Sequence, residues 1–130
     1  MALPNGAGGY QFGDGNENEI NMVTQVAPTA KTAAATLTAE LATGIITYTG
    51  AAAALTVPLG TDLDSAFPSM KTNSCFDFFV INIGGTNAAT VTANTGCTLV
   101  GAAAVAAGAS CQWRVRKTAA STYVFYRVAG

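Results

Sequence analysis

The chain has 130 residues, a net charge of −1 and only 10% charged side chains, so it lacks the basic surface that electrostatic nucleic-acid binding needs. Half of its residues are apolar, which is enough for one domain with its own core. Because a soluble monomer normally carries more charge, we expect partner protein to cover much of the surface. A threonine-rich, uncharged exterior of a secreted protein is the alternative.

Residues 1–32 are predicted to form an extended N-terminal arm. Its glycine-rich, polar stretch 5–19 has no helical or strand period and cannot build a core. A purely flexible tail has no use for large apolar side chains, yet several are spaced along the arm. We therefore expect the arm to order on a partner surface; a disordered terminus, or a tail folded back on its own domain, is the alternative. The anchor residues would be Tyr10, Phe12, Ile20, Met22 and Val26.

Targeting signals and disulfides are not expected. The first residues lack the basic and apolar regions of a signal peptide, and the alanine runs are too short to span a membrane. The three cysteines, Cys75, Cys97 and Cys111, are odd in number and lack a CxxC spacing. Free thiols of this kind suit folding in a reducing compartment.

Residues 33–130 are predicted to form a small all-β sandwich, because short apolar segments alternate with Gly, Asn and Pro turns. One helical turn or two is expected at 61–67, with Thr61 as N-cap, Asp62 and Asp64 near the N-terminus and Pro68 after the end. Strands are expected at 36–40, 44–48, 53–57, 74–83, 89–93, 97–100, 103–106, 110–116 and 121–128.

Two of these segments are apolar on both faces, which a half-buried antiparallel strand normally is not. In 74–83, Phe76, Phe78 and Val80 alternate with Phe79, Ile81 and Ile83. In 121–128, Tyr123 and Phe125 alternate with Val124, Tyr126 and Val128. We expect the core to take one set and a second subunit the other, so that the subunit interface comprises Phe79, Ile81, Val124, Tyr126 and Val128.

Patterns that would indicate an enzyme or a metal site are weak. The chain has no histidine, which excludes Ser-His-Asp and Cys-His nucleophile systems and the common zinc sites. The glycines at 6–15 lack the strand, helix and Lys of a phosphate-binding loop. A calcium loop beginning at Asp14 fails, because Glu19 and Gln25 stand where Gly and Glu are required. No catalytic residue, metal or cofactor is predicted.

The charged residues of the predicted strands are expected to be structural. Asp77 lies between large apolar residues, so we expect Arg114 or Arg127 to pair with it rather than a catalytic role. Arg114, Arg116 and Lys117 form the one basic cluster. It could hold a few phosphates or an acidic partner, but such a run is more often the solvated side of a strand.

The order of segments resembles the trimeric decoration, or cement, proteins on the heads of tailed bacteriophages. The resemblance covers most of residues 33–130. It is carried by the glycine-rich arm, by the stretches at 37–46, 54–64, 76–84 and 91–101, and by the strands Trp113-Arg-Val-Arg and Tyr123-Val-Phe-Tyr-Arg. It implies a jelly-roll-like β-sandwich and a homotrimer over capsomer junctions. The arm, Met1 to about Ala30, would run over the major capsid protein, so the protein would lie on the outer head surface of the virion after assembly in the bacterial host cytoplasm.

The same style of sequence occurs in phage tail-fibre and knob domains. A receptor-binding domain for a host surface glycan is therefore the alternative function, and it requires an exposed aromatic platform. Trp113, the single tryptophan, is in phase with Cys111 and Val115 and is expected to be buried. Nucleic acid and membranes are not expected partners, and an enzyme is the least favoured class.

Overall fold

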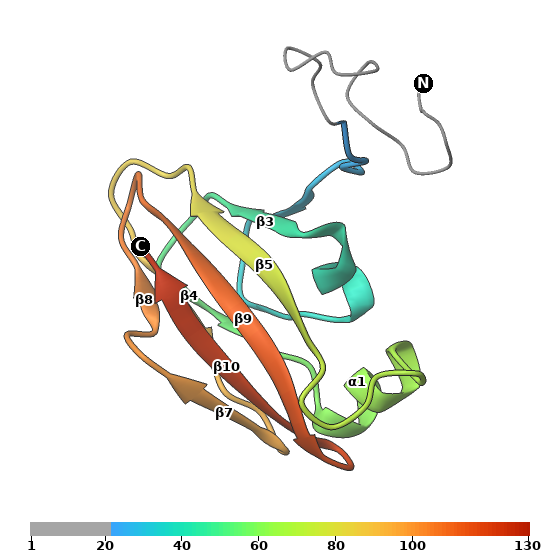
Figure 1. The fold of residues 1–130 in the computed structure, drawn as a ribbon. Helices are drawn as coiled ribbons and strands as arrows, with labels where there is room; N and C mark the ends of the chain where they lie inside the picture. Colours follow the sequence, from blue (N-terminus) through green and yellow to red (C-terminus); the bar gives the residue numbers. More distant parts are fainter. Residues whose placement is uncertain (1–21) are drawn as a thin grey trace.

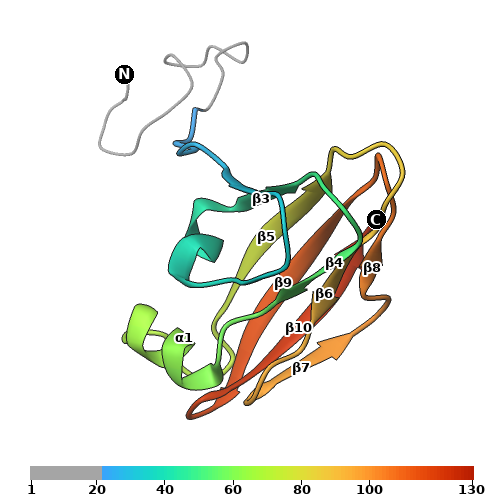
Figure 2. The same cartoon turned by 180° about the vertical axis from the view of Figure 1, so that it is seen from behind.

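The computed structural model describes residues 22–130, which form a sandwich of two β-sheets, as the sequence predicts. Figure 1 faces the larger sheet, and Figure 2 faces the smaller one. The six-stranded sheet has the order β1 (Thr29–Lys31), β3 (Ile45–Tyr48), β5 (Cys75–Asn82), β9 (Ser110–Ala119), β10 (Thr122–Ala129) and β7 (Cys97–Val100). The four-stranded sheet has the order β2 (Ala35–Thr36), β4 (Ala53–Thr56), β6 (Ala89–Thr92) and β8 (Ala104–Val105).

The chain crosses from one sheet to the other after every strand from β1 to β8, whereas β9 and β10 are neighbours in the large sheet. Within the large sheet β1, β3 and β5 are parallel to one another, and within the small sheet β2, β4 and β6 are parallel. Antiparallel pairs occur at β5–β9, β9–β10 and β6–β8. In these connections the sandwich differs from the antiparallel Greek keys of a jelly roll. The expectation that a strand has one solvated face assumed antiparallel pairing, whereas β5 is antiparallel to β9 but parallel to β3.

The core lies between the sheets and follows the period-two alternation of the strands. Phe78 and Phe125 meet edge to face at 6.1 Å between ring centroids. Trp113 is fully buried and its indole N–H donates to Cys111 Sγ at 3.1 Å, so the predicted burial of both residues is confirmed. The largest fully buried side chains are Trp113, Tyr48, Tyr123, Phe78 and Phe125.

Two local predictions are wrong. The strand expected at 36–40 ends at Thr36, and the chain turns into the 3₁₀ helix η1 (Ala39–Thr43), capped by the Thr38 hydroxyl. The helix α1 (Gly60–Ala66) has Leu59 rather than Thr61 at its N-cap. Its first residue must be glycine, because a Cβ on Gly60 would collide with the carbonyl of Ser121.

The sandwich begins within the segment assigned to the arm. Residues Thr29–Lys31 form β1, which pairs with β3 and is the edge of the six-stranded sheet. Before it, Gln25 is held against the domain because its side-chain Nε2 donates to the carbonyl of Thr43 at 2.6 Å. Met22 and Val26 are exposed, and Tyr10, Phe12 and Ile20 lie outside the described residues.

One carboxylate ties α1 to the β9–β10 hairpin. Asp64 accepts hydrogen bonds from the Tyr123 hydroxyl at 2.6 Å and from the Ser121 backbone N–H at 2.7 Å, and forms an ion pair with Lys117 at 3.0 Å. The bond from Tyr123 and then that from Lys117 hold the pKa of Asp64 well below its usual value. Both effects favour the ionised carboxylate in the folded state.

The free energy of unfolding should therefore depend on pH through Asp64. Because the pKa is lower folded than unfolded, the stabilisation is complete above the ordinary value near 3.8 and is lost as the pH falls towards the folded value. Asp64→Asn should lower the melting temperature at neutral pH and flatten the acid dependence. Thermal melts of both proteins between pH 2 and pH 7 measure this, and parallel curves would contradict it.

Candidate functional site: the outer face of the large sheet

The outer face of the six-stranded sheet is the side turned away from the core. On β5 it carries the odd-numbered residues from Cys75, and on β9 the even-numbered ones. Neighbouring strands align these side chains: Ile45 is opposite Phe79, which is opposite Gln112. On the other side of β9, Tyr126 is opposite Val100. No strand or helix of residues 22–130 covers this face (Figure 1).

A polar row, composed of Gln112, Arg114 and Arg116, follows β9 through the middle of the outer face. Arg114 makes a two-pronged contact with Asp77, with nitrogen–oxygen distances of 2.7 and 2.9 Å, and Gln112 donates to the same carboxylate at 3.1 Å. Of the two partners predicted for Asp77, Arg114 is confirmed, and Arg127 donates instead to the carbonyls of Ala102 and Ala104. The hydrogen bond from Arg114 lowers the pKa of Asp77, so the pair is ionised and mutually neutralised at neutral pH.

Arg116, the third residue of the polar row, is also held by neighbours. Its Nε and Nη2 donate to the hydroxyl of Tyr126 at 3.0 and 2.8 Å, and its Nη1 donates to the Asn73 side chain at 2.8 Å. The guanidinium carbon lies 5.7 Å from the centroid of the Tyr126 ring. Each side chain of the row thus has at least one hydrogen-bond partner within the chain.

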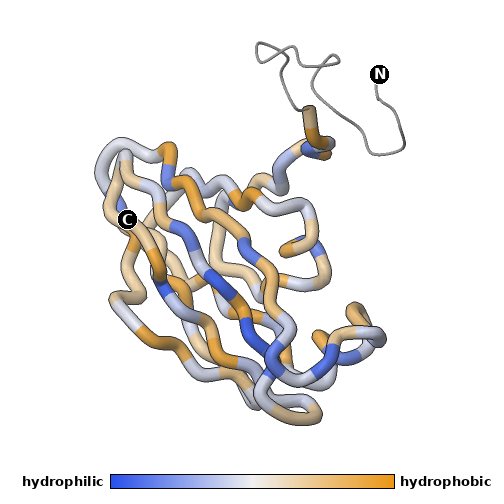
Figure 3. Tube along the Cα trace, in the orientation of Figure 1, coloured by the Kyte–Doolittle hydropathy of each residue, from blue (hydrophilic) through white to orange (hydrophobic). Residues whose placement is uncertain are grey.

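Apolar side chains lie on both sides of this row. Figure 3 shows hydrophilic segments along β9 between hydrophobic segments of β5 and β10. The exposed fraction is 42% for Phe79 and 62% for Ile83 on one side, and 48% for Val100 and 49% for Val128 on the other. Leaving four large apolar side chains in water on one face is unfavourable, by roughly 25 cal/mol per Å² of apolar area.

The outer face holds all five residues predicted for a subunit interface. Phe79 and Val128 are exposed, while Ile81, Val124 and Tyr126 are half-buried against their neighbours. The two strands are not adjacent, because β9 lies between β5 and β10. Sequence reasoning missed Ile45 and Val100, whose places follow from the register of β3 and β7, which no local pattern reveals.

The three thiols are free, and two of them are buried. Burial raises the pKa of Cys97 to about 11 and also raises that of Cys111, so these two are packed as small apolar groups. Cys75 is exposed at the start of β5. Among the described residues, no three His, Cys, Asp or Glu side chains gather as a metal site would require.

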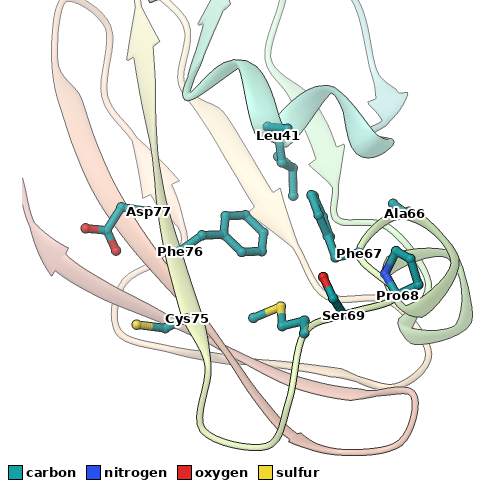
Figure 4. A pocket seen from close by; sticks show the side chains of 10 residues that line it. Leu41, Ala66, Phe67, Pro68, Ser69, Cys75, Phe76 and Asp77 are labelled. Atoms are coloured by element: carbon teal, nitrogen blue, oxygen red, sulfur yellow. The ribbon is translucent and has the colours of Figure 1, made fainter. Parts of the chain in front are cut away.

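One pocket, of about 460 Å³, opens beside the start of β5 and was not predicted. In Figure 4, Phe67 and Phe76 face each other across it with Leu41 above, whereas the side chains of Asp77 and Cys75 point away. The two rings are 5.0 Å apart between centroids. Its lining comes from η1, from the end of α1 and the loop after it, and from β5.

No protein-family model, curated protein or solved structure matches this chain. Among residues 22–130, no helix is long and apolar enough to span a membrane.

Proposed function

We propose that the chain is a structural subunit of a bacteriophage head, a decoration or cement protein that binds the outer head surface at capsomer junctions and stabilises the shell. Three copies would associate through the outer face, and their arms would contact the major capsid protein. The observation that carries the proposal is the outer face itself, with apolar side chains exposed on both sides of a polar row in which Arg114 is paired with Asp77.

The polar row supports burial at a subunit interface. An unpaired charge buried in an interface costs several kcal/mol, whereas a charge that already has its partner needs none from the other subunit. Asp77 with Arg114 meets this condition within one chain, whereas Arg116 is hydrogen-bonded to the neutral Tyr126 and Asn73 and keeps its charge. The opposite surface, on the four-stranded sheet, offers mainly alanine and threonine, such as Thr90 and Ala104.

The arm supports the capsid contact. Met22, Val23 and Val26 are exposed and precede the sandwich, so they are free to pack on another protein. Three weakly binding arms on one oligomer gain avidity of about 10²–10⁴-fold through effective concentration. A shell held this way resists separation of its capsomers because many contacts must break together.

Binding to heads that lack the protein tests the proposal. The wild-type chain should cosediment with such heads, and electron microscopy should show added density over capsomer junctions. Met22→Asp with Val26→Asp should abolish binding while leaving the oligomer intact, and the exposed Thr24→Asp should bind normally. Density on the tail, together with glycan binding that Phe79→Ala removes, would overturn the proposal in favour of a receptor-binding domain.

A further inference from the structure

The first half of β5 has a partner strand on one side only. β9 pairs with β5 from Cys75 to Ile81, but β3 begins at Ile45, opposite Phe79. Residues Cys75–Phe78 therefore form an open edge inside the six-stranded sheet, where the line of β3 stops short. Among residues 22–130, no other strand continues that line.

The backbone groups on this open edge are those of alternate residues. The N–H of Phe79 donates to Gly44 O and that of Ile83 to Tyr48 O, so odd-numbered residues direct their N–H groups towards β3. The N–H of Asn82 donates to Ala109 O on the β9 side. By this alternation the N–H and C=O of Cys75 and Asp77 point to the open edge, ready for another strand.

The pocket of 460 Å³ lies against this same edge. Cys75 and Asp77 line it although their side chains point away, and Phe76 contributes its ring (Figure 4). Phe67, Met70 and Leu41 provide further apolar surface. A free strand edge beside an apolar pocket is the arrangement that binds an extended peptide, whose backbone pairs with the edge while a side chain fills the pocket.

We propose that the N-terminal arm of the same chain adds as a strand along Cys75–Asp77 and places Tyr10 and Phe12 in the pocket. The two aromatic residues are two apart, so on a strand they share one face. Aromatic rings there would pack on the Phe67–Phe76 pair, with which edge and offset contacts are favourable. This inference does not depend on the proposed function, and it leaves the exposed Met22, Val23 and Val26, rather than Tyr10 and Phe12, as the part of the arm that contacts the capsid.

The place where the arm joins the domain favours the same chain, rather than a second copy, as the source of the added strand. Gln25 is bound to Thr43, the last residue of η1, and Leu41 and Ala42 of that short helix line the pocket. The 13 residue steps from Phe12 to Gln25 can span about 43 Å when extended, whereas the five residues of η1 cover about 10 Å. A tether this short gives an effective concentration in the millimolar range.

Amide hydrogen exchange of the full-length chain, followed by NMR, tests the inference. Tyr10→Asp with Phe12→Asp should speed the exchange of the Cys75 and Asp77 amides by about tenfold or more, because the added strand is lost. The amides of Phe76 and Phe78, which face β9, are internal controls and should not change. Gln11→Asp is the matched control variant: its side chain would point away from the pocket, and protection should remain.

Two results would overturn the inference. If the Asp77 amide exchanges equally fast in wild type and in the double variant, no strand from the arm occupies the edge. If its protection is lost on dilution of the wild-type protein, the strand comes from a second copy and the same-chain assignment is wrong. Protection that is independent of concentration and lost only in the double variant supports the inference.

Discussion

Phe79→Lys combined with Val128→Lys is expected to leave the chain folded but convert its oligomer into monomers. The two side chains lie on opposite sides of the polar row, with exposed fractions of 42% and 49%. Changes at exposed positions usually alter the free energy of unfolding by no more than about 0.5 kcal/mol. In an interface, by contrast, each new unpaired ammonium group would cost several kcal/mol, or about two orders of magnitude or more in association.

Light scattering after size exclusion measures the mass, and denaturant unfolding measures the stability. The matched control is Thr86→Lys with Thr90→Lys, which adds the same charge at two exposed residues outside the large sheet. The control should keep the wild-type mass. Loss of the oligomer in the control as well would mean that added charge, rather than its position, is responsible. An oligomer that survives in the Phe79 and Val128 variant would place the interface elsewhere.

Trp113→Ala is expected to destabilise the sandwich by about 3–5 kcal/mol, the usual cost of truncating a large buried aromatic residue. Trp113 is fully buried in the central strand β9, and its loss leaves a cavity between the sheets and removes the hydrogen bond to Cys111. The free energy of unfolding of a domain is about 5–15 kcal/mol in total, so the variant loses a large fraction of its stability.

Trp113→Phe is the graded control and should cost less, because the ring fills part of the volume. Far-UV circular dichroism in increasing urea is the suitable measurement, since the variants lose their one tryptophan fluorophore. A midpoint for Trp113→Ala equal to that of wild type would contradict the assigned core. The same result would also contradict the assignment of the odd-numbered residues of β9, from Cys111 to Val115, to the buried face.

Residue alternation was sufficient to predict much of the fold. The phase of Cys111 with Trp113, and of Tyr123 with Phe125, identifies the buried face of β9 and β10. An acidic residue placed among apolar ones predicts a basic partner for Asp77, although not which of Arg114 and Arg127 it is. These predictions succeed because the period of two is a local property of the strand.

Strand order and register could not be predicted, because they depend on contacts far apart in sequence. No local pattern shows that β3 starts four residues along β5, so the open edge at Cys75–Phe78 and its pocket were missed. The parallel alignment of β1, β3 and β5 was missed for the same reason. The glycine at position 60 reads as a turn signal, but its role is to admit the carbonyl of Ser121.

The central claim is that the outer face of the large sheet is a subunit interface. Sedimentation equilibrium of the purified full-length chain tests it most directly. The account predicts a mass three times the 13.1 kDa of the chain at micromolar concentration. In the variant with lysine at Phe79 and Val128 the mass should fall to that of a single chain. A wild-type chain that sediments as a monomer at every concentration measured would contradict it.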